Sequence, residues 1–81
     1  MDSPLNLSRL PRNAPATVAA VDWARLADPE ARRLRELGFD DGVAVATLHR
    51  SAFRGPIACQ VGRMIVALRR AQAAAVLVEP A

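Results

Sequence analysis

The residues best suited to chemistry in this chain are its single cysteine, Cys59, and its single histidine, His49. They fall on two neighbouring predicted strands, 57–61 and 43–50, so strand pairing could bring them close. A nucleophilic thiol needs the imidazole on the same face of the sheet and within hydrogen-bond reach. The sequence does not require that arrangement. We therefore interpret Cys59 as a buried thiol and His49 as a surface imidazole.

The spacing of possible metal ligands argues against a metal site. A structural metal needs three or four ligands at short local spacing, and the chain contains no CxxC or HxxxH pattern. Asp40 and Asp41 are adjacent, so their side chains diverge, and we interpret them as turn formers and not as an acid–base pair. The four glycines form no GxxxxGK or GxGxxG phosphate cradle. We predict no metal, no cofactor and no enzymatic activity.

The basic residues raise the question of nucleic-acid binding. All eleven are arginines, the net charge is +3 and the sequence pI is about 11.0. Arginine without lysine or tyrosine inflates the pI at a modest net charge, and such a charge permits phosphate binding without requiring it. Arg32, Arg33 and Arg35 share one predicted helix with several flanking carboxylates, which would repel phosphate. This pattern favours a solvated helix face or a protein-binding face.

The helix that carries these arginines is predicted over residues 28–37. Asp28 is a good N-cap, Pro29 suits the first helical position, and Gly38 fits the left-handed position that ends a helix. One apolar stripe along the helix is formed by Ala31, Leu34 and Leu37. Phe39 would fold back on the last turn. We expect the helix to close one end of a small barrel.

The remaining elements are short strands. They are predicted over residues 16–22, 43–50, 57–61, 64–69 and 76–79, with one helical turn at 70–75. Gly62 and Arg63 join two strands as a hairpin, with Gly62 suited to a type II′ turn. Ahead of the first strand, Leu5, Leu7 and Leu10 could tuck a short turn against the body. Five short strands in so small a protein favour closure into a barrel, which removes the sheet edges.

Length and composition limit the remaining possibilities. A chain of 81 residues is one domain at most, with a thin core. A single cysteine cannot form an internal disulfide. The N-terminus lacks the basic start and apolar run of a signal peptide, and no apolar run approaches the roughly 20 residues that span a bilayer. We expect a cytoplasmic protein.

Several motifs now combine in a specific order. The chain reads LRELGFDDGVAVATLHRSAFRGPIACQVGRMIVALRRAQAAAVLVE from Leu34 to Glu79. The telling features are Leu37-Gly38-Phe39, Gly42 before a strand with Val45, Gly55-Pro56-Ile57, Val61-Gly62 and Ala67-Leu68-Arg69-Arg70. In order and spacing they resemble the FeoA family of small cytosolic proteins of bacterial ferrous-iron uptake. The likeness covers about residues 7–79. The departures are Asp40-Asp41-Gly42 and Arg54-Gly55-Pro56, where the family commonly has Pro-Gly and Gly-Asp-Pro.

The resemblance implies a mainly β fold, a small SH3-like five-stranded barrel with a helix between strands 1 and 2. It implies a non-catalytic accessory protein that acts on the FeoB-type membrane transporter through the transporter's cytosolic GTP-binding part. We expect the partner to meet the helix edge and the 51–56 loop. The expected contact residues are Arg33, Leu34, Leu37, Phe39, Phe53 and Arg54.

Other functions remain open from the sequence. The chain could be a regulatory domain related to the C-terminal SH3-like domain of iron-dependent repressors, although no helix-turn-helix is present and it would act in trans. It could also be a small basic barrel that binds nucleic acid, although we do not expect this. Exposed leucines beside a thin core make self-association a further expectation.

Overall fold

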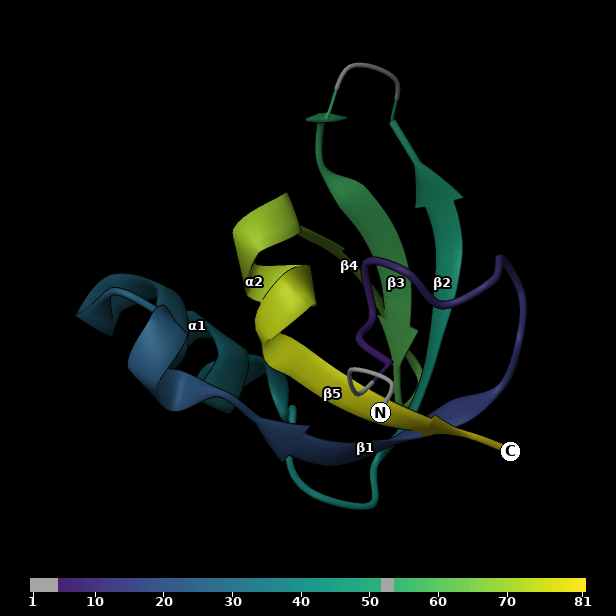
Figure 1. Ribbon diagram of the computed structural model, residues 1–81, viewed down its shortest axis with the longest axis horizontal. Coiled ribbons are helices and arrows are strands. Elements are labelled where there is room, and N and C mark those ends of the chain that lie inside the picture. The colour runs from purple at the N-terminus through teal and green to yellow at the C-terminus, as the bar shows by residue number, and fades with distance from the viewer. Residues whose placement is uncertain (1–4, 52–53) are drawn as a thin grey trace.

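The computed structural model describes residues 5–51 and 54–81 and contains five strands and three helical segments (Figure 1). In chain order these are β1 (Ala16–Val21), the 3-10 turn η1 (Trp23–Arg25), α1 (Asp28–Leu37), β2 (Ala44–Arg50), β3 (Ile57–Val61), β4 (Met64–Leu68), α2 (Arg70–Ala75) and β5 (Val76–Pro80). The strands form one antiparallel sheet in the order β4-β3-β2-β1-β5. The predicted five-stranded fold with a helix between strands 1 and 2 is confirmed.

The sheet curls because β1 divides its pairing between two partners. Only Ala16 and Thr17 pair with β2, whereas β1 pairs with β5 from Ala16 to Val21 with a break at Ala19. Register shifts in the β1–β5 and β2–β3 pairs add bends that a flat sheet would lack. Figure 1 shows β1 and β5 running across the direction of β2, β3 and β4. The concave side of this curled sheet holds the core.

Helix α1 begins one residue earlier than a cap at Asp28 would place it. The N-cap is Ala27, so the predicted Asp28 cap is wrong, and the backbone N–H of Ala27 donates to Glu30 Oε1 at 3.3 Å. Glu30 therefore accepts the N–H of the N-cap residue from within the first turn. Its negative charge also stabilises the helix, because it lies near the positive end of the helix dipole. Gly38 ends the helix with φ +91°, as predicted.

Large apolar side chains from most elements fill the core. Those with no exposed surface include Leu7, Leu10, Leu34, Phe39, Ile57, Leu68 and Val76. Phe39 folds back as predicted, and its N–H donates to the Leu34 carbonyl oxygen at 3.1 Å. Leu7 and Leu10 tuck against the body as predicted. Both ends of the chain therefore contribute to one core.

Residues 5–14 cross the open side of the curled sheet without forming a regular element. The Leu7 N–H donates to the Val76 carbonyl oxygen at 2.9 Å, and the Asn13 N–H to that of Thr47 at 2.7 Å. Arg50 holds the same segment from β2, because Nε donates to the Ser8 carbonyl oxygen at 2.9 Å and Nη2 donates to that of Leu10. This segment therefore links β5 to β2 through backbone bonds to both strands.

Candidate functional site

The possible nucleophile and base do not form a catalytic pair. Cys59 is fully buried and lies opposite Thr47, whereas His49 is exposed and lies opposite Ala58. Burial raises the pKa of the Cys59 thiol to about 11, so the thiol stays protonated at neutral pH. Among residues 5–51 and 54–81, no three His, Cys, Asp or Glu side chains gather where they could hold a metal ion.

The structure divides the predicted partner-binding residues into two groups. Leu34 and Phe39 have no exposed surface, so they belong to the core and offer nothing for a partner to touch. The expectation that these two residues contact a partner is therefore corrected, because both side chains face the core. Leu37 is half-buried and packs against the core.

The charged members of the set remain at the surface. Arg33 and Arg54 are exposed, and Arg54 has a positive φ of 62°. Phe53 lies outside the described residues. Among the described contact residues predicted from the sequence, Arg33 and Arg54 are therefore the ones whose side chains are exposed to a partner.

The three arginines of α1 have different surroundings. Arg33 Nη2 donates to the carbonyl oxygen of Ala67 in β4 at 3.3 Å. The guanidinium of Arg35 lies 4.4 Å from the ring centroid of Trp23, a cation–π contact on another side of the helix. Arg32 is exposed. Arg33 is thus the one of the three that connects α1 to the sheet.

A hollow of about 410 Å³ lies where α1, the 51–56 loop, the end of β4 and the start of α2 meet, and we call it the helix–loop hollow. It is lined by Pro29, Glu30, Arg33, Pro56, Ala67, Leu68, Arg69 and Gln72. Figure 1 shows α1 and α2 on the same side of the sheet. The two segments that the sequence linked to a partner, the helix edge and the loop, thus share one concavity through Arg33 and Pro56.

Gln72 fixes the geometry of the helix–loop hollow. It is buried, accepts a hydrogen bond from the Arg69 N–H at 3.0 Å through Oε1, and donates through Nε2 to the Glu30 carbonyl oxygen at 3.5 Å. These bonds tie the start of α2 to α1. Sequence reasoning did not identify Gln72 or Arg69 as site residues. The sequence feature that could have identified Arg69 is its position next to Arg70 at the end of a predicted strand.

The charges around the helix–loop hollow suit an acidic ligand group. Arg33 and Arg69 are both exposed there, and Glu30, the one carboxylate among the described lining residues, accepts from the Ala27 N–H at the start of α1. Guanidinium groups bind carboxylates through two parallel N–H donors. The arrangement can therefore bind a carboxylate-bearing segment of a protein. Its surroundings supply neither a nucleophile nor a metal site within the described part of the chain.

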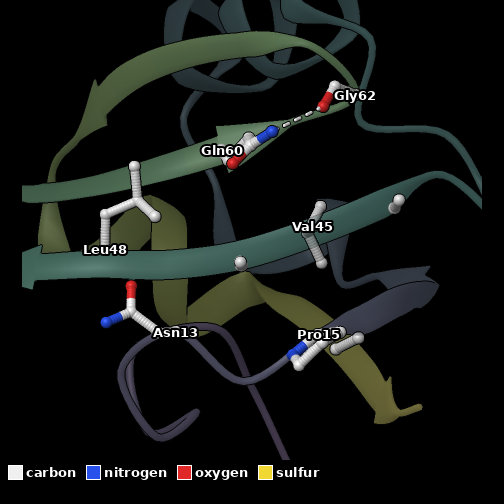
Figure 2. Close-up of a pocket in the computed structure, with 9 residues that line it drawn as sticks. Asn13, Pro15, Val45, Leu48, Gln60 and Gly62 are labelled. Atoms are coloured by element: carbon white, nitrogen blue, oxygen red, sulfur yellow. Dashed lines mark hydrogen bonds between the residues drawn. The ribbon is translucent and has the colours of Figure 1, made fainter.

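A second hollow of about 330 Å³, which we call the sheet hollow, lies on the outer face of β2 and β3. Figure 2 shows Leu48 and Val45 of β2 between Asn13 and Pro15 on one side and Gln60 and Gly62 on the other. Gln60 Nε2 donates to the Gly62 carbonyl oxygen at 3.2 Å. No charged side chain lines this hollow among the described residues, so it is less suited to a charged partner.

Comparison with known proteins places the chain in a family. Residues 5–80 match the family model for the FeoA domain. This chain belongs to the FeoA family. The resemblance inferred from its motifs is confirmed, and no curated protein matches it.

Solved structures agree with this assignment. The FeoA of Stenotrophomonas maltophilia, solved in complex with zinc and described as a procaryotic SH3 domain protein and a candidate activating factor of ferrous iron transport, is 38% identical, with a TM-score of 0.78 over 93% of this chain and 89% of that one. The FeoA of Chlorobium tepidum is 26% identical, with a TM-score of 0.80 over 94% of this chain and 70% of that one.

A manganese-dependent transcriptional repressor matches with a TM-score of 0.83 and 21% identity, over the whole of this chain and 43% of the repressor. That likeness shows the fold alone. The SH3-like fold is therefore shared by FeoA-family proteins and by part of a repressor. The described part of this chain has no helix long and apolar enough to cross a membrane.

Proposed function

We propose that this FeoA-family chain is a non-catalytic accessory protein of bacterial ferrous-iron uptake that works in the cytoplasm. It binds the cytosolic GTP-binding part of the FeoB-type transporter. Membership of the family supports the link to ferrous-iron transport. The observation that carries the interaction is the helix–loop hollow, where Arg33 and Pro56 from the two expected contact segments meet beside Arg69.

The surface of the helix–loop hollow suits a protein contact. Arginine is enriched at protein interfaces, where its planar guanidinium forms directed bonds to carboxylates. Arg33 is already oriented by its bond to the Ala67 carbonyl oxygen, so less side-chain freedom is lost on binding. Arg54 is exposed and lies two residues before Pro56 in the chain, so it adds a positive charge to the same segment. Leu37 supplies partly exposed apolar area at the other end of α1.

A role without catalysis fits the placement of the reactive groups. Cys59 is in the core and its raised pKa keeps the thiol neutral, whereas His49 faces solvent. Neither residue lines either hollow. An effect on transport would therefore arise from binding, through a change in the partner's conformation or its contacts.

An NMR titration tests this function. The labelled chain is titrated with the cytosolic part of the transporter. We expect amide shifts at Arg33, at Arg69 and at the two residues that flank Pro56, Gly55 and Ile57. Arg33→Glu should weaken binding by about tenfold or more, since it replaces an attraction with a repulsion. Arg9→Glu, the same charge change at an exposed residue outside both hollows, should leave binding within about twofold, the small effect usual for a charge at the rim of an interface or beyond it.

A DNA fragment serves as the control ligand. Shifts at the arginines with DNA that disappear in moderate salt, together with none from the transporter part, would mean that the chain is a nucleic-acid-binding barrel. Equal losses of transporter binding in Arg33→Glu and Arg9→Glu would mean that net charge, and not the helix–loop hollow, governs the interaction.

A further inference from the structure

Strand β4 forms one edge of the sheet, and only its β3 side is paired in the described part of the chain. The two-residue turn at Gly62 and Arg63 fixes which backbone groups face β3. Val61 and Met64 close the hairpin as a hydrogen-bonded pair, so Met64, Val66 and Leu68 direct their N–H and carbonyl groups toward β3. Ile65 and Ala67 direct theirs outward.

The outward groups of β4 are mostly available. The Ala67 carbonyl oxygen accepts from Arg33 Nη2, which confirms that Ala67 faces away from β3. The Ile65 N–H, the Ile65 carbonyl and the Ala67 N–H have no backbone partner outside the β3–β4 ladder among the described residues. These three groups form a short template to which another strand could add.

The side chains of β4 are unusual for an unprotected edge. Ile65 is 70% exposed and Met64 is 48% exposed, and they are the large exposed hydrophobic residues of the described chain. Natural edge strands are commonly protected by charges, proline or a covering element. Here the charged residues next to the strand in sequence are Arg63 and Arg69, at its two ends, and Arg33 reaches the edge from α1 at Ala67. The middle of the edge is open and apolar.

We propose that the free edge of β4 binds an extended segment of a partner protein by strand addition. The segment has apolar side chains at its centre, against Ile65 and Met64, and acidic residues toward its ends, against Arg63 and Arg69. Arg33, bonded to Ala67, adds positive charge at the second end. Backbone hydrogen bonds supply the affinity and the flanking arginines select acidic ends.

The same charges disfavour a second copy of this chain as the occupant. In the antiparallel register that would use both Ile65 and Ala67 of each copy, Arg63 of one copy would lie opposite Arg69 of the other at both ends. Like charges directly opposite each other destabilise strand pairing. A partner with acidic ends meets no such repulsion.

The edge and the helix–loop hollow form one continuous surface. Ala67, Leu68 and Arg69 end the strand and also line that hollow. A segment added along β4 would therefore reach Arg33 and Arg69 as it leaves the edge. The identity of the segment as part of the FeoB-type transporter rests on the proposed function, whereas strand addition itself rests only on β4.

Amide hydrogen exchange of the labelled full chain tests the proposal. Two probes are used, the cytosolic part of the transporter and the synthetic peptide acetyl-Glu-Val-Thr-Val-Thr-Glu-amide. Each saturating probe should slow exchange at Ile65 and Ala67 by about tenfold or more, because these amides gain a partner. Exchange at Met64, Val66 and Leu68 should change far less, since these amides already bond to β3. This alternation distinguishes strand addition from a contact made by side chains.

Two variants at one position separate the backbone from the side chain. Ile65→Pro removes the outward N–H and is tolerated on an edge strand. It should weaken binding of both probes by about tenfold or more, while the β3–β4 amide signals stay in place. Ile65→Thr keeps the N–H and a β-branched shape, and should weaken binding by about threefold at most.

The outcomes separate this proposal from the proposed function. Transporter binding that is unchanged in Ile65→Pro, without protection of Ile65 and Ala67, would overturn strand addition and leave the accessory role standing. Peptide binding at the edge without transporter binding would support strand addition and overturn the proposed partner. Protection of the edge that rises with protein concentration alone would identify a second copy as the occupant and overturn the proposal. Failure of both probes would overturn it as well.

Discussion

The hydroxyl of Thr47 donates a hydrogen bond of 2.8 Å to the carbonyl oxygen of Leu7, forty positions earlier, and both residues are fully buried. This bond joins β2 to the segment that crosses the open side of the sheet. Arg50 continues the attachment through bonds to Ser8 and Leu10. Two side chains of β2 thus hold residues 5–14 in addition to the backbone bonds that this segment makes to β5 and β2.

Thr47→Val should destabilise the domain by about 1–3 kcal/mol, because it leaves the buried Leu7 carbonyl without a donor while it preserves the shape of the side chain. Urea unfolding measures this loss as a lower midpoint with an unchanged slope. Thr47→Ser keeps the hydroxyl and loses one methyl group, and is the matched control. A serine variant less stable than the valine variant would show that packing, and not the hydrogen bond, is the main contribution of Thr47.

Leu34→Ala should lower the free energy of unfolding by about 2–5 kcal/mol, since Leu34 has no exposed surface and its truncation leaves a cavity. Leu37→Ala, at a half-buried position one turn later, should cost clearly less. Thermal or urea unfolding of both variants gives the comparison. Equal losses, or a small loss at Leu34, would mean that this side chain is not packed in the core and would return it to the candidate contact surface.

Gly38→Ala should destabilise the domain by roughly 1–2 kcal/mol, because an L residue is strained at φ +91°. A Cβ there would meet no atom within 4 Å, so the cost is conformational and not steric. Gly38→Asn is the control, since asparagine accepts the left-handed region more readily. Equal stability of the alanine variant and the unmodified chain in urea would show that the end of α1 relaxes to another conformation.

Features set by neighbours along the chain could be predicted from the sequence. The helix over 28–37 follows from Pro29 at its start, Gly38 at its end and apolar residues at helical spacing. The hairpin at Gly62 follows from a glycine between two apolar runs, and its φ of 57° at the first turn position fits the predicted type II′ turn. The Asp28 cap was predicted wrongly, because Glu30 reaches back to Ala27 from within the first turn.

Features set by residues far apart in the sequence could not be predicted. The periodicity of α1 identifies Leu34 as apolar, but whether that stripe meets the core or a partner depends on where the sheet curls. Gln72 became part of the site only because α2 packs against α1, and the side-chain amide then finds the Glu30 carbonyl. The helix edge with Arg33 and the 51–56 loop were expected to form one contact surface, but Pro56 was not among the expected contact residues, and no local pattern connects it to Arg33.

The alkaline pH dependence of stability should report on Cys59 almost alone. The chain has no lysine and no tyrosine, so Cys59 is the side chain that titrates between about pH 8 and 11. Burial raises its pKa from 9.0 to about 11 in the folded state. Between these values the unfolded chain binds fewer protons than the folded chain, and stability must therefore fall as the pH rises.

The expected loss is roughly 2–3 kcal/mol from pH 8 to pH 11, because the thiol pKa is 9.0 in the unfolded chain and about 11 in the folded chain. Urea unfolding at several pH values measures it. Cys59→Ala is the control, because it lacks the thiol and should keep a nearly flat profile over this range even if its stability is lower throughout. A thiol-reactive dye should label the folded chain slowly and the urea-unfolded chain fast. The same downward slope in Cys59→Ala would assign the alkaline loss to another group and contradict a buried, protonated Cys59.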